Sequence, residues 1–147
     1  MITFRDAMRG DVPRICALMS DDVLGRTREG HEMRRYLDAF DRIAEEPQNH
    51  LIVGEMDARI VATYQITFIS GLSLGATRRA QVETVRVATD LRGRGIGREM
   101  FADAEARARE AGCGLLQLTM NRTRADAHRF YEGLGFAATH TGFKKTL

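Results

Sequence analysis

The chain lacks tryptophan, and it has only two cysteines and two prolines among its 147 residues. The cysteines, Cys16 and Cys113, are too far apart in the sequence to form a metal-binding or redox motif. The four histidines are scattered as well, without the spacing that metal ligands share, so we expect no metal site. We expect each cysteine to be a small buried residue in a reducing compartment, as in a cytoplasmic protein.

Long apolar runs and long runs of one charge are also missing. No segment is apolar enough to cross a membrane, and the N-terminus has no apolar signal-peptide core, so we expect neither membrane association nor export. The 22 basic residues nearly balance the 20 acidic residues, and the pI of 8.8 reflects only a small excess. This balance argues against a nucleic-acid partner. A length of 147 residues predicts one domain, residues 1–147, with room for a hydrophobic core.

What the chain does have is a hexapeptide rich in glycine and arginine, Arg92-Gly93-Arg94-Gly95-Ile96-Gly97. Residues 82–87 before it are rich in β-branched side chains, whereas residues 98–110 after it are strong helix formers. At a strand–turn–helix junction of this kind, the unpaired N–H groups of the first helical turn and the helix dipole attract an anion. Glycine in turn lets a ligand approach the backbone closely. The hexapeptide therefore predicts a phosphate-binding site.

Two common phosphate-binding motifs do not fit the glycine spacing. A dinucleotide-binding fingerprint that starts at Gly93 needs glycine where the chain has Arg98. One that starts at Gly95 needs glycine where the chain has Met100. A P-loop needs a Gly-Lys pair, which the sequence does not contain. A nucleotide-binding α/β domain is therefore disfavoured.

The spacing that does match is Arg-x-x-Gly-x-Gly, and with it the chain resembles the GNAT superfamily of acetyl-CoA-dependent N-acetyltransferases. In that family this turn binds the pyrophosphate of coenzyme A. A second motif, from Ala127 to Phe136, resembles the family's Ala-x-x-x-Tyr helix that ends in Gly-Phe. Taken alone, Tyr131 would be explained more simply as a core tyrosine with its hydroxyl bonded to a carbonyl. Two motifs in the right order and at the right separation favour the functional role.

Hydrophobic periodicity predicts one continuous alternation of strands and helices. Strands are expected at residues 2–6, 50–55, 60–69, 82–87 and 115–120, and from Phe136 onward. Helices are expected after an N-cap at Asp11, at residues 31–46, from Ile96 to Gly112, and around Tyr131. The third helix should face the core with Ile96, Met100, Ala104 and Ala108, and carry the pair Asp103–Arg107 on its exposed side. The resulting order, β-α-α-β-β-β-α-β-α-β, is that of the GNAT fold, a single α/β (α+β) domain with a mixed sheet.

The resemblance also implies where the cofactor lies. In the family two parallel central strands separate at a bulge, and the pantetheine arm pairs with the first of them as an added strand. Here the first strand would be residues 83–87 and the second residues 115–120. The implied cofactor-binding residues are Val85, Val87, Arg92, Gly93, Arg94, Gly95, Ile96, Gly97, Arg98 and Asn121. The backbone groups of the valines would face the pantetheine and the arginines would screen the phosphates, whereas an asparagine at the end of a strand is as often a simple turn residue.

Acetyl transfer requires that an amine with a pKa near 10.4 lose a proton. Glu83 is the candidate base, because strand alternation puts it on the face of Val85 and partial desolvation would raise its pKa. The alternative is an ordinary ion pair between Glu83 and one of three arginines, Arg78, Arg79 and Arg86. A backbone N–H near Val85 would polarise the thioester carbonyl. Tyr131, whose ordinary pKa is near 10, would return a proton to the thiolate.

These residues predict an N-acetyltransferase that moves the acetyl group of acetyl-CoA to a primary amine of a small molecule or peptide, by direct transfer in a ternary complex. The alternative is a non-catalytic acyl-CoA-binding module, which would need neither Glu83 nor Tyr131. The sequence does not identify the amine: Asp21 and Asp22 would attract a cation, but acidic pairs in loops are mostly solvated. Because the tail after Phe136 has room for one strand only, we expect the substrate side to be open or completed by the second subunit of a homodimer.

Overall fold

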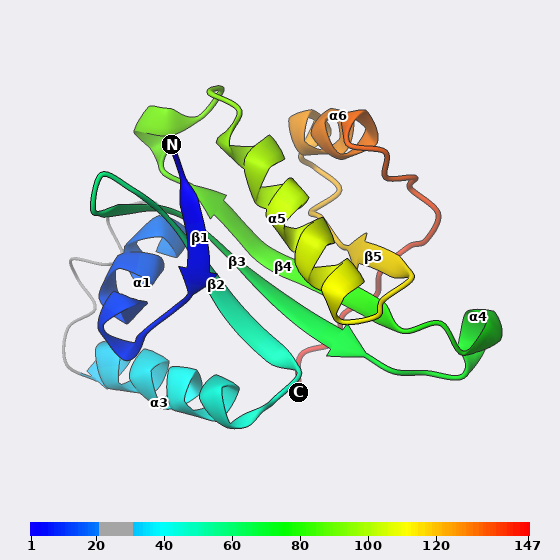
Figure 1. Cartoon of the computed structure of the whole chain (residues 1–147), viewed down its shortest axis with the longest axis horizontal. Helices are drawn as coiled ribbons and strands as arrows, with labels where there is room; N and C mark the ends of the chain where they lie inside the picture. The colour runs from blue at the N-terminus through cyan, green and yellow to red at the C-terminus, as the bar shows by residue number, and fades with distance from the viewer. Residues whose placement is uncertain (21–30) are drawn as a thin grey trace.

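The computed structural model describes residues 1–20 and 31–147 (Figure 1). The strands are β1 (Thr3–Asp6), β2 (Asn49–Met56), β3 (Arg59–Ile69), β4 (Arg79–Val87) and β5 (Leu115–Leu118). The helices are α1 (Val12–Ser20), α3 (His31–Glu45), α4 (Ser73–Ala76), α5 (Ile96–Glu110) and α6 (Ala125–Gly133), with 3-10 turns η1 (Arg9–Asp11) and η2 (Thr89–Leu91). In the described part of the chain the strands form one sheet in the order β1-β2-β3-β4-β5. The predicted mixed α/β fold is confirmed.

The first four strands of the sheet are antiparallel, and β5 is parallel to β4. A parallel neighbour needs a crossover, which α5 provides as it runs back across the sheet (Figure 1). α5 packs on β3 and β4 from the front of the view, while α1 packs on the same two strands and α3 packs on β2. Side chains on both faces of β3 are buried, because Val61 and Thr63 lie on the opposite face from Tyr64. The sheet is therefore covered on both sides at its centre.

The apolar stripe of α5 forms the middle of the core. Its residues Ile96, Met100, Ala104 and Ala108 are all buried, as their helical spacing predicts. Asp103 and Arg107 form the predicted ion pair at 2.8 Å, but both side chains are half-buried. The prediction that both side chains are exposed was wrong, because Asp103 accepts a hydrogen bond from the hydroxyl of Tyr64 on β3.

The hairpin between β2 and β3 turns where the sequence predicts it. Asp57 and Ala58 occupy the two turn positions with φ of 49° and 61°. Two successive left-handed residues are typical of the primed turns that join twisted antiparallel strands. The strand predicted after α5 is β5, which begins at Leu115 as expected and ends two residues early, at Leu118.

Two predictions about the ends of the chain were wrong. Residues 136–147 form no strand, although the expected order of elements ended with one. Phe143 is 92% exposed there, and residues 137–142 lack the apolar alternation with which a strand would cover the core. Asp11 does not cap α1 either, because its carboxylate accepts the N–H of Met8 at 2.8 Å and the guanidinium of Arg5 at 2.7 Å.

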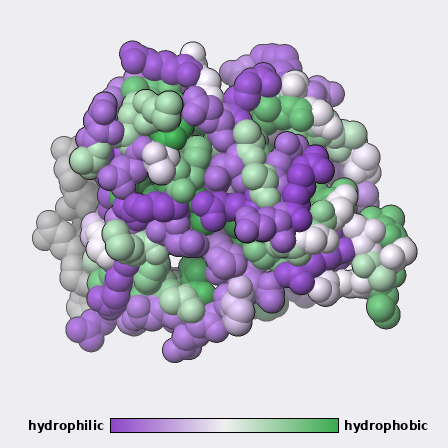
Figure 2. Space-filling model, viewed as in Figure 1, coloured by the Kyte–Doolittle hydropathy of each residue, from purple (hydrophilic) through white to green (hydrophobic). Residues whose placement is uncertain are grey.

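Polar and apolar side chains are mixed over the face of the molecule seen in Figure 2, with an apolar projection at the α4 corner. Leu72 and Leu74 form this projection and are 94% and 72% exposed.

None of the described helices is both long and apolar enough to cross a membrane. Both cysteines are free, and Cys16 is buried as expected, which raises the pKa of its thiol. Cys113 is half-buried.

Candidate active site

The glycine turn, residues 92–97, connects η2 to α5 as the sequence predicts. Gly93 and Gly95 have φ of 76° and 84°, in the left-handed region that glycine enters without strain. No heavy atom lies within 4 Å of the position that a Cβ would take at either residue. The backbone at these two positions is therefore open to a close ligand.

α5 begins directly after this turn without a side-chain cap. Its N-cap residue, Gly95, has no side chain, and no side-chain hydrogen bond closes this end of the helix. The N–H groups of the first turn have no partner within the helix, so they and the helix dipole favour an anion. Arg94 and Arg98 are exposed at the same end, whereas the side chain of Ile96 is buried in the core. Only the backbone of Ile96 is thus available to a ligand.

The second sequence motif, on α6, packs against the first turn of α5. A Cβ at Gly97 would lie 3.0 Å from Cζ of Phe130, which is at the limit of what side chains tolerate. Phe130 is followed by Tyr131, and the centroids of the two rings are 5.4 Å apart. The missing side chain at Gly97 therefore brings the glycine turn and the tyrosine helix together.

A β-bulge interrupts β4. The register with β3 pairs Glu83 with Gln65 and Arg86 with Thr63, so two residues of β4 lie opposite one residue of β3. Thr84, within the bulge, has a φ of 56°, a left-handed value that β-branched residues rarely adopt. The bulge that the GNAT resemblance implies is therefore present.

β4 and β5 separate at the bulge. Val82 pairs with Leu118 and the ladder ends there, although β4 continues to Val87. Among the described residues no strand lies beside residues 83–87 on this side. The carbonyl of Val85 accepts a hydrogen bond from Nη1 of Arg86 at 2.9 Å, and each such carbonyl has a second lone pair. In the described part of the chain, residues 83–87 of β4 thus have the unpaired edge that addition of an extended chain requires.

The bulge also changes which side chains share a face. Two residues that are paired across antiparallel strands point to the same face of the sheet. Residues two positions apart on one strand, such as Thr63 and Gln65, also point to the same face. Glu83 and Arg86 therefore share a face, while Val85 packs against the core. The predicted common face of Glu83 and Val85 was wrong, because regular alternation does not hold across a bulge.

Glu83 is exposed, so its expected partial desolvation is not observed. The alternative role is not observed either, because Glu83 forms no ion pair with any residue that the structure describes. A carboxylate without a basic partner at the mouth of the opening can accept a proton from a ligand. Its role as the base stays a prediction.

Tyr131 is half-buried in a cluster of aromatic rings. The rings around it are those of Phe101, Phe130 and Phe136, with centroids 5.4 to 5.9 Å away. Within residues 1–20 and 31–147 its hydroxyl has no hydrogen-bond partner, so a tyrosine anchored on a core carbonyl is not what the structure contains. Burial raises the pKa of Tyr131 above 10, although the guanidinium groups of Arg124 and Arg86 oppose the rise. The phenol therefore keeps its proton at neutral pH.

Two other predicted cofactor-binding residues, Asn121 and Arg92, form hydrogen bonds with nearby residues of the chain. Oδ1 of Asn121 accepts the N–H of Thr123 at 3.0 Å and its hydroxyl at 2.7 Å, which is a turn role. Nε of Arg92 points to the carbonyl of Val87 at 3.4 Å. Asp21 and Asp22 lie outside the described residues. The contacts of Asn121 and Arg92 with a cofactor stay predictions.

Two arginines near Tyr131 had no predicted place in the site. Arg86 was expected only as an ion-pair partner, and Arg124 was assigned no role. Both lie close enough to Tyr131 to affect its pKa, one from β4 and one from the start of α6. No local pattern identifies such a pair, because the two residues meet only through the packing of separate elements.

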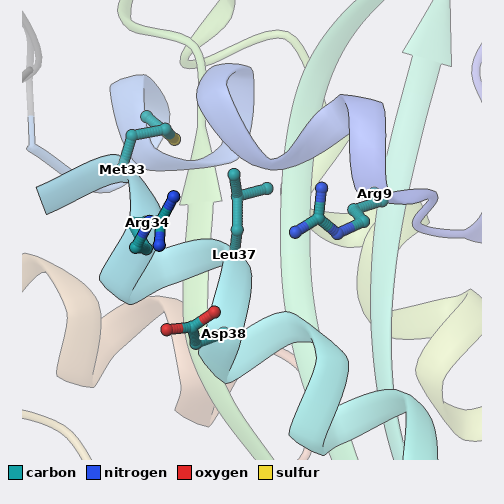
Figure 3. Close-up of a pocket in the computed structure, with 5 residues that line it drawn as sticks. All are labelled: Arg9, Met33, Arg34, Leu37 and Asp38. Carbon is teal, nitrogen blue, oxygen red and sulfur yellow. The ribbon is translucent and has the colours of Figure 1, made fainter. Parts of the chain in front are cut away.

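A hollow away from this site lies between η1 and α3 (Figure 3). It is lined by Arg9, Met33, Arg34, Leu37 and Asp38. Arg9 is paired with Asp41 at 3.1 Å, and no predicted site residue takes part. In the described ranges, 1–20 and 31–147, no three His, Cys, Asp or Glu side chains come together as metal ligands.

Comparison with known proteins agrees with this geometry. The model of the acetyltransferase (GNAT) family matches residues 16–136. The aminoalkylphosphonate N-acetyltransferase of Salmonella typhimurium is 40% identical over 67 residues, which are 46% of this chain and 44% of that protein. The match thus spans less than half of the length of this relative.

Two solved structures are similar over essentially the whole chain. A protein from Bacillus halodurans described as a transcriptional regulator is 41% identical, with a TM-score of 0.89 and 100% of both chains covered. A protein from Agrobacterium tumefaciens described as an acetyltransferase is 27% identical, with a TM-score of 0.85 and 99% of both chains covered. The overall fold of this chain is therefore shared with both of these proteins.

Proposed function

Because the chain belongs to the acetyltransferase (GNAT) family and is an acyltransferase, we propose that it moves the acetyl group of acetyl-CoA to a primary amine of a small molecule or peptide. Transfer is direct, with both substrates bound in a ternary complex. The observation that carries the proposal is the opening of β4 from β5 at the bulge, followed in the chain by the open glycine turn. The uncapped start of α5 completes this arrangement.

The residues of this chain suit acetyl-CoA, which supplies an activated acetyl group when bound. Gly93 and Gly95 leave space at the turn, and the first N–H groups of α5 offer donors to a pyrophosphate. Arg94 and Arg98 add positive charge at the same end. Residues 83–87 of β4 offer N–H and C=O groups to an extended chain that contains amides.

Two side chains would move protons. Glu83 accepts the proton that the amine must lose before it attacks, directly or through a water. Tyr131 holds its proton at Oη and gives it to the departing sulfur, and its raised pKa keeps the phenol in the donating form. A backbone N–H near Val85 polarises the carbonyl that is attacked.

The acceptor is proposed to be a small amine rather than a protein. The relative from Salmonella typhimurium is named as an aminoalkylphosphonate N-acetyltransferase, and its matched segment is 40% identical to this chain. This supports placing short amines that carry a phosphonate first in any panel of acceptors. Lysine peptides and polyamines are the comparison substrates.

The test combines binding and turnover. Acetyl-CoA should raise the melting temperature of the protein, and release of the free thiol should depend on one class of amine. Amino acids, polyamines, aminoglycosides, lysine peptides and aminoalkylphosphonates form the panel. A thermal shift without thiol release on any of these amines would favour the non-catalytic acyl-CoA-binding module instead.

A further inference from the structure

Arg86 lies on the same face of β4 as Glu83, because the bulge removes one step of the alternation. The residues of β3 paired with them, Gln65 and Thr63, are two positions apart, so the two attachment points are separated by about 7 Å along the strand. This places a guanidinium and a carboxylate side by side at the opening between β4 and β5. They are not paired with each other, as no ion pair joins them.

Arg86 has donor groups to spare. Its Nη1 donates to the carbonyl of Val85 at 2.9 Å, whereas a guanidinium has five N–H donors in all. Arg59, by contrast, is held by both oxygens of Asp90 at 2.8 and 2.9 Å. Arg86 is half-buried and has no carboxylate partner among the described residues. A charge that is partly removed from water without a counter-ion is costly, and a bound anion would offset that cost.

A second arginine on the side of Tyr131 is Arg124, which is exposed at the start of α6. Arg124 is the N-cap residue of α6, seven positions before Tyr131, so the two residues lie on one side of the helix about 10 Å apart along its axis. Side chains on a helix lean toward its N-terminus, which directs the phenol of Tyr131 toward Arg124. Both Arg124 and Arg86 lower the pKa of Tyr131, as they would if both charges lie near its hydroxyl. Arg124, like Arg86, has no carboxylate partner in the part of the chain that the structure describes.

From this placement we propose that Arg86 and Arg124 bind an anionic group of the acceptor, so that the substrate is a short amine carrying a phosphonate, a phosphate or a carboxylate. This rests on the acetyl transfer proposed above. The planar, forked guanidinium suits such oxyanions because it donates two parallel hydrogen bonds. Glu83 receives the amine end of the same molecule. The short distance between Glu83 and Arg86 selects acceptors whose amine and anion are only a few bonds apart.

Kinetics with matched acceptors test this directly. The acceptors are 2-aminoethylphosphonate, 2-aminoethyl phosphate, 3-aminopropanoate and neutral propylamine, all at saturating acetyl-CoA. At least one anionic acceptor should exceed propylamine in kcat/KM by tenfold to a hundredfold, and the order among the three identifies the anion. Arg86→Gln should remove at least tenfold of that preference, and Arg86→Lys only part of it. Equal kcat/KM for anionic and neutral amines in the parent would overturn the proposal.

Arg79→Gln is the matched control. Arg79 lies on the same strand and the same face as Arg86 and is also half-buried. It lies at the other end of β4, where it is in register with Leu115 of β5. Its substitution should leave the preference for anions unchanged. A loss in this variant as large as in Arg86→Gln would mean that net charge alone is responsible, which contradicts the proposal.

A binding measurement separates the anion site from the chemistry. Ethylphosphonate has no amine, so its affinity for the protein with coenzyme A bound can be measured by calorimetry without turnover. It should bind the parent at least tenfold more tightly than Arg86→Gln or Arg124→Gln. If these variants instead lose affinity for coenzyme A and keep the anion preference, the arginines serve the cofactor and the proposal fails. If ethylphosphonate binds through Arg86 but no amine is acetylated, the anion site stands and the acetyl transfer is rejected.

Discussion

The hydroxyl of Tyr64 donates to Oδ2 of Asp103 across 2.5 Å, which ties the centre of β3 to α5. The same carboxylate oxygen accepts from Nε of Arg107 at 2.8 Å, and Arg107 also reaches the carbonyl of Phe4 on β1 at 3.4 Å. Tyr64 is fully buried, and its burial together with the nearby carboxylate raises the pKa of its phenol well above 10. Asp103 therefore fixes the helix that carries the glycine turn in place on the sheet.

We expect Tyr64→Phe to lower the free energy of unfolding by about 2 kcal/mol at pH 7, because a hydrogen bond to a charged group is lost. The pKa of Tyr64 is higher in the folded than in the unfolded chain, so this contribution is complete below pH 10 and is lost as the pH rises above it. Urea denaturation at pH 7 and pH 10.5 measures this. The difference between parent and variant should shrink at the higher pH, and a constant difference would contradict the argument.

Gly95→Ala should weaken the binding of acetyl-CoA by tenfold or more, since a methyl group would occupy the open side of the turn. Gly112→Ala is the matched control, because Gly112 lies just beyond the other end of α5 with a φ of 79° and an equally open Cβ position. Each variant should lose about 1 kcal/mol of stability through left-handed strain. Because both variants carry the same strain, a difference in their affinity for acetyl-CoA, measured by calorimetry, reports on the binding site alone. Equal affinities in the two variants would mean that the glycine turn does not bind the cofactor.

Tyr131→Phe removes one hydroxyl and keeps the aromatic cluster, so cofactor affinity should hardly change. The kcat should fall by about 10²- to 10⁴-fold, which is the usual contribution of one positioned proton donor. Steady-state rates and a binding isotherm on the same preparation measure both effects. Unchanged turnover would mean that water protonates the thiolate and that Tyr131 only packs.

Glu83→Gln should slow transfer at neutral pH and recover partly at high pH, where more of the amine is already neutral. The rate should therefore rise more steeply with pH in the variant than in the parent. Rates between pH 6.5 and pH 9.5 at saturating acetyl-CoA measure the two slopes. Parallel profiles would show that the amine loses its proton elsewhere, and catalysis would then depend on Tyr131 and the backbone.

Much of this fold was predictable from local patterns. Ile96, Met100, Ala104 and Ala108 recur at intervals of four, and such a stripe can be buried only if the segment is a helix against an apolar layer. The glycine turn was equally predictable, because it stands between a β-branched segment and a run of helix formers. The end of the chain was not predictable in this way, since residues 137–142 offer no periodic pattern and Phe143 is 92% exposed.

The interior of the site was harder to predict for a physical reason. Nothing local marks Thr84 as left-handed, because β-branched residues avoid that conformation and only the pairing of β4 with β3 enforces it. A single extra residue that the sequence pattern does not reveal reverses the face to which every later side chain of the strand points. The faces of Glu83 and Arg86 therefore could not be predicted from alternation. The approach of Arg86 to Tyr131 depends on how α6 packs against β4, which no single segment encodes.

The bulge at Thr84 has a consequence for how this chain can change. Deleting that one residue would restore an unbroken alternation through β4, relieve the left-handed threonine, and let β5 pair along more of the strand. We expect the shortened chain to be more stable and to lack the opening that we propose for the substrates. Selection for thermal stability alone would therefore tend to remove the separation of β4 from β5. Variants recovered from a stability screen without an activity screen should accumulate changes around this residue.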